Sequence, residues 1–303
     1  MNIRVIDFTL LIFPALLLFI TFYKSVFYSG TNSSEEYSPV MWELSQAKML
    51  QAVACLGVIL HHLTQHISSY GSIYRGPITI LSSMGILFTS IFFFFTGYGL
   101  IVSVTNNPNY LSTFLRHRLS TVLVPFLTAN ILCVLFRVFY SHIPTMPIDV
   151  VRAIFGFVLL NGNGWYIVEV FFLYIAFYIL FRFIKNKDFA LILLCIFTVL
   201  LIRYSYGLGH DHSDIGDRPF YGEWWYNSTV VFIMGLLFAR FKNSIVTFLK
   251  RFYRFILPAT SVLFIIAFVV EERILKTHGY YRESITIDRI SSAFITLIAQ
   301  MIL

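Results

Sequence analysis

The stretch Lys48-Met-Leu-Gln-Ala-Val-Ala-Cys-Leu-Gly-Val-Ile-Leu-His-His-Leu-Thr-Gln-His66 predicts a membrane-crossing helix with one polar face. From residue 49 to residue 60, every side chain except Gln51 and Cys55 is apolar. At 100° per residue, the polar side chains gather within an arc of about 60°. They are Lys48, Gln51, Cys55, His62 and His66. A narrow polar face on an apolar helix indicates a cavity, a pathway or a site.

The adjacent histidines of this helix allow two interpretations. His62 lies on the polar face, whereas His61 points well away from that face. Histidine exchanges protons near neutral pH, so His62 is a candidate general base, and His61 is the alternative if the helix is rotated. Otherwise, both histidines contact lipid headgroups at the end of the helix.

The composition is that of a membrane protein. The 303 residues are 58% hydrophobic and 12% charged, with a mean hydropathy of +0.77, which exceeds what a soluble core requires. The net charge of +7 fits cytoplasmic loops and anionic headgroups better than nucleic acid. Cys55, Cys133 and Cys195 all lie in apolar runs, so neither a disulfide framework nor a zinc site is expected.

Apolar runs divide the chain into about nine expected spans, which predicts an all-α polytopic transmembrane bundle. The expected spans are 5–28, 48–67, 78–104, 119–140, 165–184, 189–204, 225–241, 254–270 and a run from 289. The last run holds only about fifteen residues, fewer than a crossing needs. We therefore expect either a short last helix or a chain truncated at its C-terminus.

Lysine and arginine predict the orientation. Basic residues prevail in the loops 105–118, 185–188 and 241–254, where Asp188 is the one acid, whereas the loop 205–224 mixes them with several acids. The positive-inside rule places the first three loops in the cytoplasm and the fourth outside. The N-terminus is then external.

Several stretches, in this order, resemble the acyltransferase-3 family of polytopic membrane proteins. The helix 48–67 resembles the family's first conserved helix, in which a basic residue precedes a functional histidine by eleven positions. His62 takes the histidine position, but Gln51 replaces the basic residue, and Lys48 could substitute for it. The run Phe92-Phe-Phe-Phe-Thr-Gly-Tyr-Gly99 resembles the family's aromatic run ending in Ser-Gly-Tyr or Ser-Gly-Phe.

The resemblance continues further along the chain. Arg116 and Arg118, followed by Pro125, are similar to the family's basic segment before a proline-containing helix, although Thr121 departs from the frequent Arg-x-x-Arg pattern. Trp165 then begins the next span, as in the family. On this resemblance, residues 48–303 form the acyltransferase-3-like membrane domain, and 1–47 are an extra N-terminal transmembrane helix and loop.

The resemblance implies a cell-membrane enzyme that transfers an acyl group, usually acetyl, from cytoplasmic acyl-CoA to a hydroxyl of a cell-surface glycan or lipid-linked sugar. Acyl-CoA is then a substrate, membrane lipids surround the protein, and no bound cofactor or nucleic acid is expected. His62 is the expected catalytic base. The expected donor-binding residues are Lys48, Gln51, Arg116 and Arg118. The expected acceptor-binding or orienting residues are Glu169, Trp165, Tyr98 and Arg137.

Other interpretations remain open. Glu169 and Arg137 could pair with each other, orient His62 or bind acceptor hydroxyls. A proton-coupled transporter or flippase would also use membrane histidines, but no second copy of the histidine helix occurs. Because Gln51 replaces a basic residue and the second arginine is missing, a catalytically silent relative is a third interpretation. The segment 207–217 holds His210, Asp211, His212 and Asp214, which we interpret as a polar loop rather than a metal site.

Overall fold

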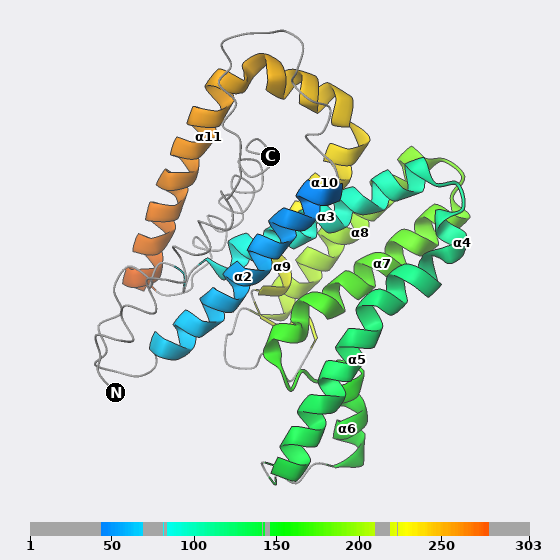
Figure 1. Cartoon of the computed structure of the whole chain (residues 1–303), viewed down its shortest axis with the longest axis vertical. Helices are drawn as coiled ribbons and strands as arrows, with labels where there is room; N and C mark the ends of the chain where they lie inside the picture. Colours follow the sequence, from blue (N-terminus) through cyan, green and yellow to red (C-terminus); the bar gives the residue numbers. More distant parts are fainter. Residues whose placement is uncertain are drawn as a thin grey trace. The chain divides into compact units, whose positions relative to one another are not determined.

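Every regular element that the computed structural model describes is helical (Figure 1). The described residues are 44–68, 81, 84–140, 142, 146–209, 219–222 and 224–278. Over these residues the expected all-α class is confirmed. Helices satisfy the backbone N–H and C=O groups within one segment, which a lipid environment requires because it offers no water.

The α-helices are α2 (Leu44–Ser68), α3 (Gly85–Asn106), α4 (Tyr110–Phe114), α5 (Ser120–Leu135), α6 (Pro147–Ile154), α7 (Trp165–Phe183), α8 (Lys187–Leu208), α9 (Trp224–Asn227), α10 (Val230–Arg240) and α11 (Lys242–His278). Two π-helical turns, η2 (Leu115–Leu119) and η3 (Phe136–Tyr140), flank α5, and a 3-10 turn, η4 (Gly162–Gly164), precedes α7.

Five helical segments in the described part of the chain are long and apolar enough to cross a membrane. They are Ala47–Gln65, Gly85–Asn106, Tyr110–Tyr140, Gly162–Phe183 and Lys187–Leu208. A bent pair, Trp224–Arg240 with Lys242–Ala267, brings the number to six. The expected spans 5–28 and from 289 lie outside the described residues, so a total of nine spans is not confirmed.

The chain divides into two compact units, Met1–Phe92 with Arg251–Leu303, and Phe93–Lys250. In the first unit, the packed face of α2 carries Ala54, Gly57, Leu60 and Thr64, all buried. The Gly57 backbone lies against the Phe88 ring, where a Cβ would meet that ring at 2.5 Å. This close approach requires glycine at position 57.

Within the second unit, α3 and α10 touch backbone to backbone. A Cβ at Gly97 would overlap the carbonyl oxygen of Phe232, and a Cβ at Gly235 would overlap the carbonyl oxygen of Phe94. Two glycines facing each other across a crossing permit the close approach typical of membrane helices. The Phe238 ring then packs on Phe94 at 5.7 Å between ring centroids.

Helix α7 lies in the middle of the second unit, and α8 runs beside it (Figure 1). The buried side chains of α7 include Leu173, Tyr174 and Phe177, and the Phe114 ring of α4 lies 5.5 Å from the Phe177 ring. Near its first turn, the Tyr166 ring meets the Phe93 ring edge-on at 4.9 Å. Aromatic contacts therefore join α3, α4 and α7.

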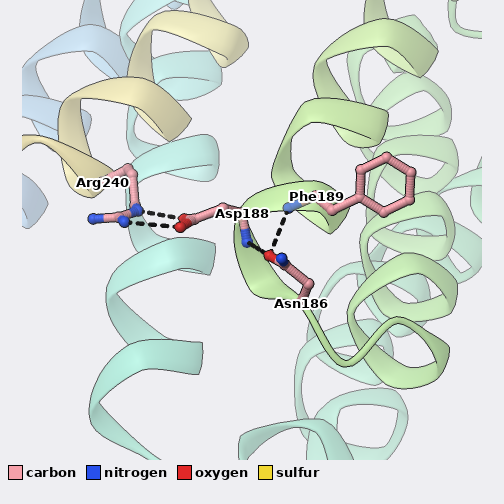
Figure 2. Close-up of polar contacts among 4 residues, drawn as sticks. All are labelled: Asn186, Asp188, Phe189 and Arg240. Atoms are coloured by element: carbon pink, nitrogen blue, oxygen red, sulfur yellow. Dashed lines mark hydrogen bonds and ion pairs between the residues drawn. The ribbon is translucent and has the colours of Figure 1, made fainter.

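At the beginning of α8, side chains connect two helix ends (Figure 2). The Asn186 side chain accepts hydrogen bonds from the backbone N–H groups of Asp188 and Phe189 at 3.0 and 3.1 Å, which caps the helix. Asp188 accepts two hydrogen bonds from Arg240 at 2.6 and 3.0 Å. Asp188 at a helix N-terminus and Arg240 at a helix C-terminus both complement the helix dipoles.

The reciprocal glycine contact predicts a strong effect of a single methyl group. Gly235→Ala forces a Cβ into the Phe94 carbonyl of α3, and the backbone there has no flexible end that can move away. We expect a loss of about 1–3 kcal/mol in the free energy of unfolding, as for overpacked cores. Thermal unfolding of the detergent-solubilised protein measures it.

The matched control is Gly207→Ala in α8. A Cβ at Gly207 would meet only the end of the Arg203 side chain, at 3.4 Å, and alanine favours a helix by up to about 1 kcal/mol. This variant should unfold at or slightly above the wild-type temperature. Equal midpoints for Gly235→Ala and Gly207→Ala would contradict the close crossing.

Candidate active site

The two adjacent histidines of α2 have different environments. His61 donates from Nδ1 to the backbone carbonyl oxygen of Leu81 at 2.9 Å, and its Nε2 lies where a Cβ at Gly85 would be. Both nitrogens of His61 therefore face protein in the first unit. His61 has the position of a packing residue, which agrees with its place away from the polar face of the helix.

His62 is partly buried, and one of its two ring nitrogens has a polar neighbour. Its Nδ1 lies 3.2 Å from the side-chain oxygen of Gln65, three residues later on the same helix. In the tautomer with its proton on Nδ1, His62 donates to this amide oxygen and Nε2 keeps its lone pair. This tautomer is the one that a general base needs, and Gln65 orients the ring.

The remaining polar residues of α2 line the same side of the helix. Lys48 and Cys55 are exposed, Gln51 is partly buried, and the side chain of His66 lies outside the described residues. The polar face is thus accessible rather than packed, in contrast to the face with Gly57 and His61.

The basic segment lies in the π-helical turn η2. Arg116 is exposed, whereas Arg118 is partly buried, although only one residue lies between them. A π-helical turn bonds each N–H to the carbonyl five residues back, and such turns often occur at functional sites. The hydroxyls of Ser120 and Thr121 donate to the carbonyl oxygens of Arg116 and His117. Thr121, at the position where the sequence resemblance implies arginine, instead donates to the backbone of this turn.

A group of hydroxyls lies inside the second unit beside Arg118. Its guanidinium has the phenol groups of Tyr110, Tyr174 and Tyr166 as electrostatic neighbours. The Tyr166 hydroxyl lies 3.3 Å from the Thr96 hydroxyl, and Thr96 also lies next to Tyr174. Thr96 belongs to the aromatic run that resembles the family, so that run supplies a polar contact as well as packing.

Glu169 is fully buried in α7. Its Oε1 accepts a hydrogen bond from the Thr229 hydroxyl at 2.5 Å, and Thr229 lies between α9 and α10. Among the described residues, no ion pair joins Glu169 to Arg137, which is partly buried in η3. The Glu169–Arg137 pair that the sequence left open is therefore absent from this part of the chain.

The aromatic candidates are packing residues with polar edges. The Trp165 ring lies 6.1 Å from the Trp225 ring and 6.2 Å from the Phe93 ring. Tyr98 is 8% exposed, and Lys242 places its Nζ 5.9 Å from the centre of the Tyr98 ring, within cation–π range.

The candidate residues belong to the two units of the chain. Lys48, Gln51, His61 and His62 are in the first unit, and the candidates of α3, η2, η3 and α7 are in the second. Four contributing residues were not singled out from the sequence: Gly99, Tyr174, Gln65 and Thr229. The spacing of three residues between His62 and Gln65 was a usable signal, because such residues are neighbours on a helix.

The expected polar loop with His210, Asp211, His212 and Asp214 lies outside the described residues. Among the described residues, no group of three or more metal-ligand side chains occurs.

Comparison with known proteins identifies the family of this chain. A family model described as an acyltransferase domain, Acyl_transf_3, matches residues 44–298, and this range includes α2, the aromatic run, η2 and α7. No curated protein and no solved structure matches the chain. The chain therefore belongs to the acyltransferase-3 family, and it is a multi-pass membrane protein of the acyltransferase type.

Proposed function

We propose that this protein transfers an acyl group, acetyl in the first instance, from cytoplasmic acyl-CoA to a hydroxyl of a cell-surface glycan or lipid-linked sugar. The observation that carries this proposal is the state of His62 in a chain of this family. With the proton on Nδ1, which lies 3.2 Å from the Gln65 side-chain oxygen, its Nε2 has a lone pair for proton transfer. The protein lies in the cell membrane with its N-terminus outside.

The reaction needs a base because a sugar hydroxyl is a weak nucleophile near neutral pH. His62 Nε2 takes the hydroxyl proton while the hydroxyl oxygen attacks the thioester carbonyl. The new C–O bond forms, the C–S bond breaks, and the imidazolium returns the proton to the departing thiolate. Protons balance, and no cofactor takes part.

The donor brings phosphate groups that need cations at the cytoplasmic end. Arg116, Arg118 and Lys48 supply them, and Gln51 lies three residues after Lys48 on the same helix face. Glu169, Trp165, Tyr98 and Arg137 bind the acceptor or orient the groups that do, and Glu169 is fixed by Thr229. Carboxyl and indole groups together suit a hydroxyl-rich ligand.

Substitution of each histidine by alanine should have a different effect. His62→Ala should lower kcat for acetyl transfer by about 10²–10⁴-fold, the usual contribution of a general base, with the protein still present in the membrane. His61→Ala should keep much more activity but unfold at a lower temperature, because it removes the hydrogen bond to Leu81. Release of CoA thiol by matched amounts of purified protein measures both rates.

The reverse pattern, with His61→Ala inactive and His62→Ala active, would reject His62 as the base. Activity of both variants would reject general-base catalysis by this pair and favour a transporter. Mass spectrometry of surface glycans in cells with and without the gene identifies the acceptor, and unchanged acylation there would favour a catalytically silent relative.

The orientation gives a further prediction. In a background without native cysteines, a single cysteine at position 186 should react with an impermeant thiol reagent only after permeabilisation, and one at position 214 should react in intact cells. The reason is that basic loops stay in the cytoplasm. Labelling of position 214 only after permeabilisation would place the donor-binding arginines on the wrong side for cytoplasmic acyl-CoA.

A further inference from the structure

The segment between α5 and α7 turns back along α5. The span that contains α5 runs from Tyr110 to Tyr140, and α6 packs beside the later part of that span (Figure 1). The buried Asn130 side chain donates a hydrogen bond to the backbone carbonyl oxygen of Ile154, the last residue of α6, at 3.1 Å. Because Asn130 precedes Tyr140 by ten residues, the chain has returned by about 15 Å at Ile154.

The return continues as far as Phe126. Gly156 follows α6 with a φ of 78°, and a Cβ on it would meet the Phe126 ring at 2.7 Å. A Cβ on Gly164 would meet the same ring at 3.3 Å. Phe126 comes 16 residues after Tyr110 and 14 before Tyr140. Both ends of the segment 156–164 therefore lie near the middle of the span.

The neighbouring helices give the same depth. The Phe114 ring lies 5.5 Å from the Phe177 ring of α7. Phe126 comes twelve residues after Phe114, and Trp165 comes twelve before Phe177, so Trp165 and Phe126 lie at one level of two antiparallel helices. One buried cluster contacts both of them together with Leu201, which is well inside α8. Helix α7 therefore begins at about half the depth of the span.

Lipid rather than water fits the surface of the later half of α5. No charged side chain occurs from residue 119 to residue 136, and Leu132, Phe136 and Phe139 are 61%, 58% and 71% exposed. Soluble surfaces rarely keep such apolar patches exposed. The 31 residues of the span extend over about 46 Å, close to the full thickness of a bilayer. Phe126 and the segment beside it thus lie near the bilayer centre.

Two asparagines in this segment are exposed. The Asn161 side chain accepts a hydrogen bond from the backbone N–H of Asn163 at 3.1 Å, and the Asn163 side chain has no hydrogen bond within the described ranges. Both side chains are exposed. Non-helical backbone at membrane depth is tolerated only where it is buried in protein or lines a water-filled cavity. Because these amides are exposed, they fit the second case.

We propose that 147–164 is a re-entrant element and that Asn161 and Asn163 line a recess, open to water on the side where α5 ends, that binds hydroxyl groups of the acceptor. Amide groups both donate and accept hydrogen bonds, which suits a hydroxyl. This inference rests on the proposed function, which makes that side external. It refines that function because it places the acceptor near the bilayer centre, so that the acyl group crosses only the inner half of the membrane.

Cysteine labelling in liposomes tests the recess without acyl transfer. In a background without native cysteines, Asn163→Cys and Leu132→Cys each place one thiol at an exposed position. A charged methanethiosulfonate reagent avoids hydrocarbon, so it should react with position 163 at least about tenfold faster than with position 132. Position 132 is the matched control because it lies nearer to Tyr140 and so to the membrane surface. Both thiols should react fully in denatured protein.

In intact cells, the same reagent should reach position 163 from outside. Three labelling results would overturn the inference. Equal reaction of positions 163 and 132 in liposomes would place the later half of α5 in water. Reaction of neither position would leave the loop covered by protein or lipid. Reaction of position 163 only in permeabilised cells would open the recess to the cytoplasm.

Asn163→Ala tests the acceptor contact. Membrane vesicles that carry the cell's own glycan are supplied with radiolabelled acetyl-CoA. Loss of one hydrogen bond should lower the initial rate of acetyl incorporation into glycan about threefold to tenfold at saturating acetyl-CoA, with KM for acetyl-CoA unchanged. Asn243→Ala is the control: Asn243 is also exposed but lies in α11, next to the basic end of α10, and its rate should equal wild type.

Equal rates for Asn163→Ala and Asn243→Ala would contradict the acceptor contact, and so would a rise in KM for acetyl-CoA in Asn163→Ala. The labelling experiment separates this inference from the proposed function. A protein that transfers no acetyl group but is labelled at position 163 and not at position 132 would contradict the transfer reaction alone and leave the recess standing.

Discussion

The contact between the backbones of α3 and α10 sets the geometry of the second unit. Gly97 and Gly235 each lack the Cβ that would collide with a carbonyl oxygen of the other helix. In lipid, helices gain no hydrophobic free energy from meeting each other, so close backbone packing is a main source of association. The aromatic side chains that flank the crossing, such as Phe94 and Phe238, add dispersion contacts on both sides of it.

The same few residues of α3 serve packing and chemistry. Thr96 contacts Tyr166 of α7, Gly97 contacts α10, and Gly99 gives space to Arg118 of η2. Because successive residues on a helix point about 100° apart, one short run can contact three neighbouring elements. Several helices therefore pack together at this motif of aromatic, hydroxyl and glycine residues. A polar group can be placed there without exposing apolar surface to water.

Sequence reasoning predicted some elements closely and missed others for identifiable reasons. Helix α7 was expected at 165–184 and covers Trp165–Phe183, because Gly164 and the end of the apolar run mark its limits. The break between α9 and α10 was not expected, because a single span was drawn over 225–241, through the polar run Asn227-Ser-Thr229. Thr229 in this run is the partner of Glu169. The helical period placed His61 and His62 on different faces of the helix. Their environments, however, are distinguished only by the contacts with Leu81 and Gln65 in the structure.

The π-helical turn η2 has a consequence for comparing this chain with its relatives. A π turn holds one residue more than the α-helical turn it replaces, so a relative shorter by one residue in Leu115–Leu119 would have a regular helix there. Every side chain before the missing residue would then point about 100° away from its direction here. An arginine placed opposite Arg118 by sequence alignment would not be its spatial equivalent, and equivalence of basic residues through this segment has to be judged from helical register rather than from position.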